Sequence, residues 1–307
     1  MMGYIEMAKA TVNDLHDSFD SHTYLDKSER NIQRVSNKLD DYIKEPTEEN
    51  IHDIRKAIRR LEATYRSLPS KKLRTKRVVR EYTEYSKKLF SINSQIRDFD
   101  IISAKLLSVE SPPQQDAIKS IEGRLFNQRR TLLNEAISIA IQLRKLRVPK
   151  LTRKIKISNR RSKERFNKVI SKFVTRIEHN LPIVVNNNQK VTELHELRKD
   201  CKKLRYLVEL LPDNSGKDQR REMDDDYLPK LIEMLEKVQD ILGIIHDYDT
   251  IIVYLNRRKR TKGRVTLIHS LLSNINRERQ NKYQEFVRFV NGYLPAANAN
   301  FFVRARM

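Results

Sequence analysis

The sequence predicts an all-α protein with two four-helix units, related by a pseudo-twofold axis, and a basic central groove or channel. Three observations lead to this prediction. A stretch at 51–69 returns at 194–212 without a gap. Apolar residues recur along most of the chain at the i, i+3, i+4, i+7 spacing of amphipathic helices. The 307 residues include six Gly, nine Pro and no Trp, so strong helix breakers are rare.

The repeated stretch reads IHDIRKAIRRLEATYRSLP in the first copy and LHELRKDCKKLRYLVELLP in the second. On a helix, each copy places its apolar residues on one stripe and its His and cations on a broad face beside it. Like charges at i, i+4 are unfavourable in an isolated helix. A single basic face is ordinarily just solvated, but two matched faces indicate a polyanion that neutralises them. The candidate ligand-binding residues are His52, Arg55, Lys56, Arg59, Arg60, His195, Arg198, Lys199, Lys202 and Lys203.

The first unit is expected at about 25–148, after an N-terminal segment at 1–24 in which a short helix near Tyr4–Phe19 is predicted. Thr-Glu-Glu after Pro46 favours a helix start, and Pro69 ends that helix. SPPQQ at 111–115 is typical of a turn. The predicted helices of this unit are Lys27–Ile43, the basic helix ending at Leu68, Lys71–Leu107 and Asp116–Leu146.

The second unit is expected at about 160–295, within one domain at 25–303. A basic connector at 144–172 leads into it, and the sequence leaves open whether this connector contacts a ligand or only attracts one. LPIVVNNNQK at 181–190 and the polar stretch at 213–227, with its acidic run Asp224–Asp226, are predicted turns or loops. The expected helices are Arg160–Asn180, the second basic helix, Pro229–Arg257 and Val265–Asn291, followed by a tail that frays.

The repeat continues beyond the His helices. Arg97-Asp98-Phe99-Asp100 corresponds to His246-Asp247-Tyr248-Asp249, and a longer polar loop in the second unit accounts for the change of register. The same register pairs Arg130 with Arg279, and we regard both as further candidate ligands. Each unit is therefore predicted to be a helix, a basic helix and two further helices.

The overall charge narrows the class of partner. Lys and Arg outnumber Asp and Glu by 62 to 40, which gives a net charge of +22 at pH 7. Such an excess favours nucleic acid, a phosphate polymer or an acidic membrane surface as a partner. The lone Cys201 excludes an intrachain disulfide and favours a reducing compartment. No apolar run approaches a membrane span, and no signal peptide is recognised, so a cytoplasmic location is expected.

At HDIRKAIRRL, HELRKDCKKLRY, IRDFDII and VQDILGIIHDYD, over about residues 25–295, the sequence resembles the CHAD domain, a family of helical domains named for a conserved histidine. The resemblance implies a pseudo-symmetric module that binds inorganic polyphosphate and has no catalytic activity or cofactor. Family members stand alone or are fused to triphosphate-tunnel domains, and they associate with polyphosphate granules. SINSQIRD lacks the Leu-Gly pair common in the family, which leaves a helix bend there open.

The residue types fit phosphate chemistry. Arg offers a fork to two phosphate oxygens, and Lys offers a mobile point charge. The two His side chains either donate to phosphate or orient an Arg. Asp98 and Asp247 are expected to brace the cations, because a carboxylate repels phosphate. The central candidates are Arg55, Arg59, Arg60, Arg198, Lys202 and Lys203, and the second rank comprises Lys56, Lys199, Arg130 and Arg279.

Two alternative functions fit parts of the sequence. A nucleic-acid-binding protein would need exposed aromatic side chains near the cations for base stacking, and Tyr206 is the main candidate. A metal-dependent HD-type phosphohydrolase would use a His-Asp pair, and such pairs begin at His16, His52 and His246. Asp53 lies inside a cation cluster that opposes metal binding, so this alternative is disfavoured. The oligomeric state is left open.

Overall fold

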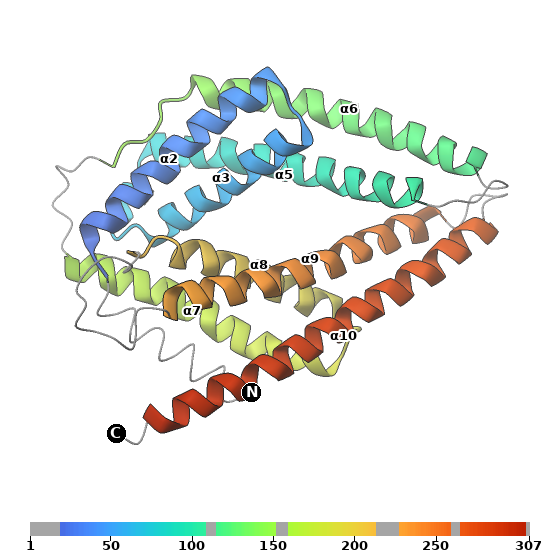
Figure 1. Cartoon of the computed structure of the whole chain (residues 1–307). Coiled ribbons are helices and arrows are strands. Elements are labelled where there is room, and N and C mark those ends of the chain that lie inside the picture. Colours follow the sequence, from blue (N-terminus) through green and yellow to red (C-terminus); the bar gives the residue numbers. More distant parts are fainter. Residues whose placement is uncertain (1–18, 109–114, 152–158, 213–226, 259–264, 305–307) are drawn as a thin grey trace.

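The computed structural model describes residues 19–108, 115–151, 159–212, 227–258 and 265–304, and every regular element in these ranges is an α-helix (Figure 1). The all-α prediction is confirmed for this part of the chain. No helix in it is long and apolar enough to cross a membrane. In chain order the helices are α2 (Ser21–Lys44), α3 (Glu48–Ser67), α4 (Lys71–Arg74), α5 (Arg77–Leu107), α6 (Gln115–Lys145), α7 (Asn159–Asn186), α8 (Val191–Val208), α9 (Tyr227–Arg258) and α10 (Val265–Arg304).

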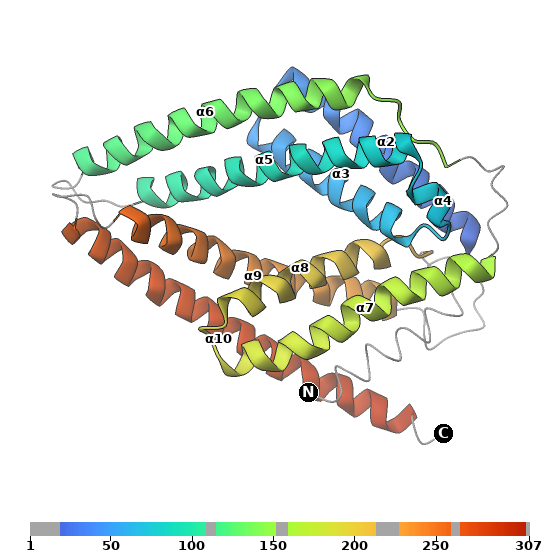
Figure 2. The same ribbon diagram turned by 180° about the vertical axis from the view of Figure 1, so that it is seen from behind.

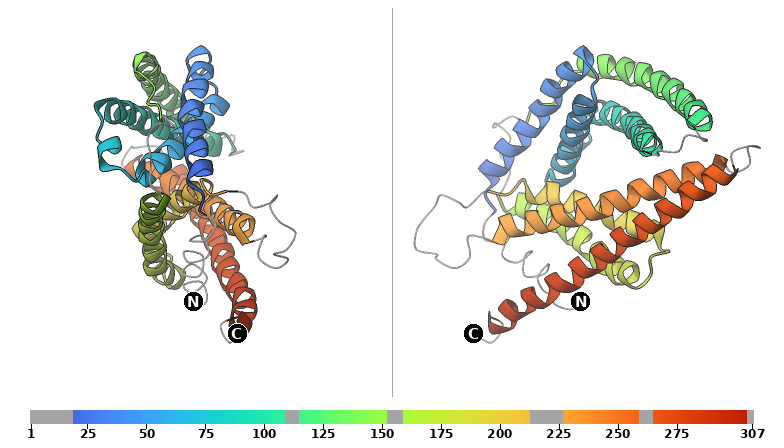
Figure 3. Two further views of the ribbon diagram at one scale, coloured as in Figure 1. Left: turned by 90° about the vertical axis from the view of Figure 1, so that its left-hand side faces the viewer. Right: turned by 45° about the vertical axis from the view of Figure 1, so that its right-hand side comes forward.

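The helices fall into two groups that lie on opposite sides of the molecule (Figures 1 and 2). In one group α2 packs against α3, and α5 against α6; in the other α7 packs against α8, and α9 against both α8 and α10. The groups meet where α3 contacts α8 and where α5 contacts α9. Figure 3 shows the α5–α6 pair and the α9–α10 pair converging where α5 ends and α6 begins and where α9 ends and α10 begins.

Buried apolar side chains form three clusters. One fills the first group and includes Val35, Ile58 and Leu89. A second fills the α7–α10 group, around residues such as Phe173. The third joins the converging ends of α5, α6, α9 and α10, with Leu255 fully buried in it. The cation-bearing faces of α3 and α8 are therefore held between two cores, because each helix buries its opposite, apolar stripe.

Local sequence sets several helix starts. The Asp20 side chain accepts hydrogen bonds from the backbone N–H groups of His22 and Thr23 at 3.2 and 2.9 Å and so caps α2. Thr47 caps α3 through the N–H of Asn50 at 3.1 Å. Such caps satisfy N–H groups that have no intrahelical partner. The predicted start of the first basic helix at Thr-Glu-Glu is confirmed.

The predicted long helix from Lys71 is interrupted. α4 ends at Arg74, and α5 begins at Arg77 after a short turn. The Arg74 guanidinium donates to the Leu68 carbonyl, and the Thr75 hydroxyl donates to the Lys71 carbonyl at 3.1 Å. The backbone N–H of Thr75 bonds the same Lys71 carbonyl at 3.0 Å, so α4 closes as a short helix before α5 begins.

The predicted turn at 181–190 is wrong for its first six residues, because α7 continues through Pro182 to Asn186. Leu181 and Val184 are buried in this extension. The Tyr283 hydroxyl donates to the carbonyls of Val184 and Val185 at 2.8 Å each and so satisfies the end of the helix. Tertiary packing therefore outweighs the local helix-breaking effect of proline.

The last helix also runs further than predicted. α10 extends to Arg304, beyond the expected end at Asn291. Other predicted features lie wholly or mostly outside the described residues. These are the short helix at 4–19, the turn at 111–115, the middle of the basic connector and the polar loop at 213–227.

Candidate functional site

α3 and α8 contact each other and bring parts of their two basic faces together. Arg55 and Arg59 come from α3, and Arg198 and Lys202 from α8; all four are partly buried. Their electrostatic influence on one another crosses the helix boundary, since Arg59 acts on both Arg198 and Lys202. We call these four residues the central cation cluster.

No acid in the described part of the chain forms an ion pair with the central cation cluster. The Nε atoms of Arg55 and Arg198 are buried and have no hydrogen-bond acceptor in this part of the structure. A buried donor without an acceptor costs about 1–3 kcal/mol. An oxyanion bound here would supply both the missing acceptors and the missing negative charge.

Burial and mutual repulsion shift the pKa values of the cluster. Burial, followed by Arg59, lowers the pKa of Arg55 to about 10. Burial, followed by the three guanidinium groups of the cluster, lowers the pKa of Lys202 to about 6. The arginines stay charged at neutral pH, whereas the Lys202 amine is largely neutral when no anion is bound.

Two carboxylates interact electrostatically with the cations. Asp98 on α5 and Asp247 on α9 are partly buried, and burial raises the pKa of each. Arg55 opposes this rise most at Asp98, and Arg198 does so at Asp247. α9 approaches closely here, since a Cβ added at Gly243 would lie 3.9 Å from Arg198 Nε. The two acids affect the cations through longer-range electrostatics, because neither acid forms an ion pair within the described residues.

The remaining basic-face residues have other surroundings. Arg60 pairs with Glu209 at 2.9 Å, and Lys203 pairs with Asp200 at 3.4 Å. Lys199 pairs with Glu196 three residues before it. Lys56 is partly buried and forms no ion pair in the described part of the chain. Arg59 and Arg60, like Lys202 and Lys203, had equal rank in the sequence prediction, but in the structure only Arg60 and Lys203 are paired with an acid.

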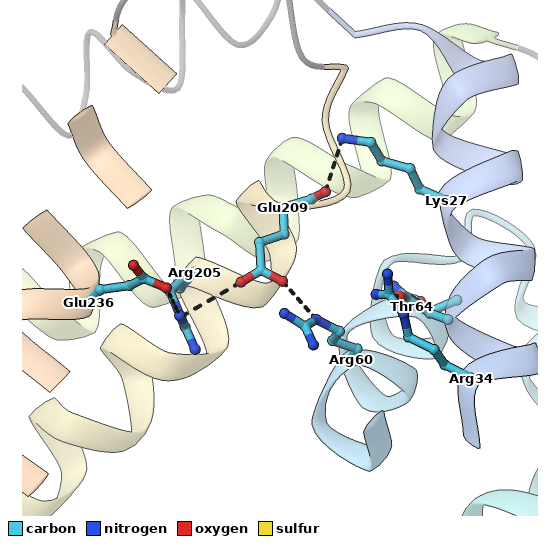
Figure 4. A network of polar contacts seen from close by, with 8 residues as sticks. Lys27, Arg34, Arg60, Thr64, Arg205, Glu209 and Glu236 are labelled. Carbon is cyan, nitrogen blue, oxygen red and sulfur yellow. Dashed lines mark hydrogen bonds and ion pairs between the residues drawn. The ribbon is translucent and has the colours of Figure 1, made fainter. Parts of the chain in front are cut away.

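Arg60 belongs to a network that joins the two helix groups (Figure 4). Glu209 near the end of α8 accepts from Arg60 of α3, and Arg205 approaches the same carboxylate at 3.7 Å. Lys27 of α2 donates to the Glu209 carbonyl at 3.3 Å and to the Leu211 carbonyl. The guanidinium groups of Arg60 and Arg205 also lie over the Tyr206 ring.

The two matched histidines lie in different environments. His52 is exposed, and partial desolvation, followed by Lys56 and Arg55, lowers its pKa. His195 is partly buried, with its Nδ1 3.2 Å from Nδ1 of His246. Burial, followed by Arg198, lowers the pKa of His246 to about 3. The second histidine therefore hydrogen-bonds a neutral partner from the repeated Asp-containing motif, a contact that the sequence pattern did not predict.

The structure does not bring Arg130 and Arg279 into the central cation cluster. Arg279 is buried and donates to the Asp249 carboxylate and to the Asn188 carbonyl at 3.2 Å. The matching ion pair in the other group joins Asp100 to Arg129 at 2.6 Å, while Arg130 is exposed. The Arg that pairs with Asp100 is thus Arg129, which on a helix lies roughly 100° around from Arg130, the residue that the sequence alignment paired with Arg279.

Arg97 is a residue that the sequence reasoning missed. It is exposed on α5, and its charge acts on Arg55, Asp98 and Asp247. The repeat aligned it with His246, so the duplication gave it no weight as a cation. Its place next to Asp98 in the RDFD motif was the available signal.

Metal-dependent chemistry finds no ready-made ligand set in the described part of the chain, where no group of three or more His, Cys, Asp or Glu side chains is arranged to hold an ion. Asp53, which follows His52, instead pairs with Lys38 at 2.9 Å.

Comparison with known families adds one match. The model of the CHAD domain matches residues 29–256, which make up most of the chain. This range includes both basic helices, α3 and α8. No curated protein matches the chain.

Proposed function

Because the chain belongs to the CHAD domain family, we propose that it binds inorganic polyphosphate and leaves the polymer chemically unchanged. The observation that carries this proposal is the central cation cluster, four partly buried cations from two helices with no acid paired to them in the described residues. A protein keeps such a cluster at a cost in stability, and a polyanion is the ligand that offsets the cost.

The chemistry of the cluster suits a polymer of phosphates. Polyphosphate presents repeated oxyanions and no bases, so recognition requires cations at suitable spacing and no base-edge readout. Arg55, Arg59 and Arg198 provide planar forks for phosphate oxygens, and Lys202 provides a point charge. The Nε donors of Arg55 and Arg198 that lack acceptors would be satisfied by those oxygens.

We further propose that the polymer runs in a basic groove between two duplicated four-helix units. The units would span about 25–148 and 160–295 of a domain at 25–303. The packing of α2, α3, α5 and α6 supports this, because α7 to α10 follow in the same order. The ion pairs Asp100–Arg129 and Asp249–Arg279 also occupy corresponding places in the two groups.

The outer cations have a secondary role in this proposal. Arg60, Lys199 and Lys203 are paired with acids, so a polymer must compete with those acids to engage them. Lys56 and the exposed His52 extend the cluster along α3, and Arg97 extends it onto α5. His195, which lies against His246, helps to position α8 in the site. Arg130 and Arg279 are left out of the proposed contact set.

Nucleic acid is the competing ligand. Base stacking requires exposed aromatic rings beside the cations. Tyr206 is buried beneath Arg60 and Arg205, and the Phe90 ring is partly buried beneath Arg55 and Arg59. Guanidinium groups already lie over these rings, where a base would have to stack. This arrangement favours a ligand without bases.

A competition experiment tests the proposal. Labelled long-chain polyphosphate bound to the full chain is challenged with unlabelled polyphosphate or single-stranded DNA at equal phosphate concentration. Displacement by polyphosphate alone is the expected result, and equal displacement by DNA would overturn the specificity. Incubation with polyphosphate and Mg²⁺ or Mn²⁺ should release no orthophosphate; steady release would overturn the non-catalytic assignment. Association with polyphosphate granules in cells is a further expectation of the same proposal.

A further inference from the structure

Three arginines gather where α3 ends. Arg66 is the exposed last cation of α3, Arg74 lies on α4, and Arg165 lies near the start of α7. Arg165 Nη2 donates to the Arg66 carbonyl at 3.0 Å, and the Arg74 guanidinium donates to the Leu68 carbonyl. Figure 2 shows α4 and the start of α7 on the same side of the molecule as the end of α3. We call Arg66, Arg74 and Arg165 the α3-end cation cluster.

No acid in the described ranges forms an ion pair with the α3-end cation cluster. The Nε atom of Arg165 is buried and has no acceptor among the described residues, as is the case for Arg55 and Arg198 in the central cation cluster. Cations at the end of a helix interact favourably with its last carbonyls, which accounts for one bond from Arg74 and one from Arg165. It does not account for the buried Nε of Arg165. Nor does it account for the Arg66 side chain, which forms no hydrogen bond in this part of the chain.

Two links connect the α3-end cation cluster to the central one. Arg59 and Arg66 are seven residues apart on α3, so they share a face and lie about 10 Å apart along the helix axis. Phe173 of α7 provides the second link, because its ring centroid lies 5.5 Å from Arg66 Cζ and 5.7 Å from Lys203 Nζ of α8. Lys203 directly follows Lys202 of the central cation cluster. Both clusters therefore border the seam where α3 contacts α7 and α8.

We propose that the α3-end cation cluster is a second phosphate-binding site, at which a long polyphosphate chain continues after it leaves the central cation cluster. This inference rests on the proposed function and deepens it by giving the polymer a path, from the middle of α3 towards the end of that helix. The guanidinium groups offer planar forks to phosphate oxygens, and such an oxygen would satisfy the buried Nε of Arg165. A chain of three phosphates offers oxyanions for the central cation cluster and none beyond it.

Glu62 is the acid that this path must pass. It is partly buried on α3 between Arg59 and Arg66 in the sequence, and it forms no ion pair within the described residues. It lies roughly 60° around the helix from Arg59, so its carboxylate repels a chain that runs between the two clusters. Glu62→Gln should therefore tighten the binding of long-chain polyphosphate by a larger factor than that of inorganic tripolyphosphate. An equal factor for both ligands would contradict a path along this face of α3.

Calorimetric titration of the full chain with long-chain polyphosphate and with inorganic tripolyphosphate tests the second site. Arg66→Gln with Arg165→Gln should weaken long-chain binding about tenfold and tripolyphosphate binding less than about twofold. Arg124→Gln with Arg277→Gln is the matched control, because it removes the same charge from exposed arginines of α6 and α10, beside the third apolar cluster. The control should weaken both ligands slightly and to the same extent.

Arg66→Gln alone keeps the side-chain bonds to the α3 carbonyls and should weaken only long-chain binding, by roughly threefold; it decides the question if the double variant does not fold. Equal losses for the two ligands, or a long-chain loss no larger than that of the control, would overturn the second site and leave the central cation cluster as the whole site. Failure of the wild-type protein to bind either ligand would instead overturn the proposed function, and this inference with it.

Discussion

At the scale of single residues, the protonation of Lys202 is tied to what binds beside it. Its pKa of about 6 in the ligand-free protein reflects burial and three neighbouring guanidinium groups. A bound polyanion reverses the sign of that environment and raises the pKa. Above pH 6, polymer binding must therefore draw a proton from solution.

The first prediction is proton uptake on binding. Calorimetric titration with polyphosphate at pH 7.5, in buffers of different ionisation enthalpy, should show net uptake in the wild-type protein. Affinity should fall as pH rises above about 6, since a larger free-energy cost is then needed to protonate Lys202. A Lys202→Arg control keeps the charge and should reduce the uptake. No uptake in the wild type would show that Lys202 is charged before binding or is not in the site.

The second prediction concerns stability without ligand. The folded-state pKa of Lys202 is below its usual value of 10.5, so the unfolded chain binds more protons between pH 6 and 10.5. Folding stability should thus rise with pH across this window through this group. At pH 7, Lys202→Met should raise the free energy of unfolding by on the order of 1 kcal/mol, and the gain should shrink at pH 9. Urea unfolding measures both; a less stable Lys202→Met protein contradicts the account.

At the scale of elements, the helices depend partly on local sequence and partly on distant partners. The basic helices α3 and α8 were predictable because an apolar stripe and a basic face lie within each segment, and α3 also carries its own Thr47 cap. The passage of α7 through Pro182 was not predictable, because it depends on the side chain of Tyr283. That contact joins residues far apart in the sequence.

The candidate site shows the same division. Helical spacing and repetition were enough to find Arg55, Arg59, Arg198 and Lys202. Sequence spacing could not rank them above Arg60, whose partner Glu209 is distant in the sequence and joins it only in the fold. Sequence spacing also could not show that Arg129 and Arg279 form ion pairs with Asp100 and Asp249, because each pair joins two different helices.

The third prediction tests the tertiary support of α7. Tyr283→Phe removes the hydroxyl that donates to the carbonyls of Val184 and Val185 at 2.8 Å. Leaving those acceptors without this donor should lower the free energy of unfolding by about 1–3 kcal/mol. Urea unfolding measures the change, with Tyr85→Phe as a control at a partly buried tyrosine without such bonds. Equal effects of the two substitutions would mean that α7 does not depend on the Tyr283 bonds.

At the scale of the whole molecule, the two helix groups are joined at separated places. The network around Glu209 links α2 and α3 to α8 near one end (Figure 4). At the converging ends of the long helices, the third apolar cluster is joined by Lys105 and Glu278 at 2.7 Å. The Glu209 network and the Lys105–Glu278 pair therefore both hold the two helix groups together.

The fourth prediction separates two roles of Glu209: the link that it makes between the helix groups and its negative charge. Glu209→Gln should release Arg60 for the polymer and tighten polyphosphate binding. It should also lower the free energy of unfolding by about 0.5–1.5 kcal/mol, because the tie between the groups weakens. Glu236→Gln is the matched control, since Glu236 pairs with Arg205 and does not contact Arg60. If both variants gain the same affinity, net charge alone explains the gain.

The central claim is that α3 and α8 contribute the unpaired cations of one polyphosphate site, and two double variants that each replace one Arg and one Lys by Gln test it directly. Calorimetry would compare Arg59→Gln with Lys202→Gln against Arg60→Gln with Lys203→Gln. The central pair should lose about 2–4 kcal/mol of binding free energy and the acid-paired outer pair clearly less. Equal losses would mean that binding depends only on net charge, and wild-type affinity in the central pair would place the site elsewhere.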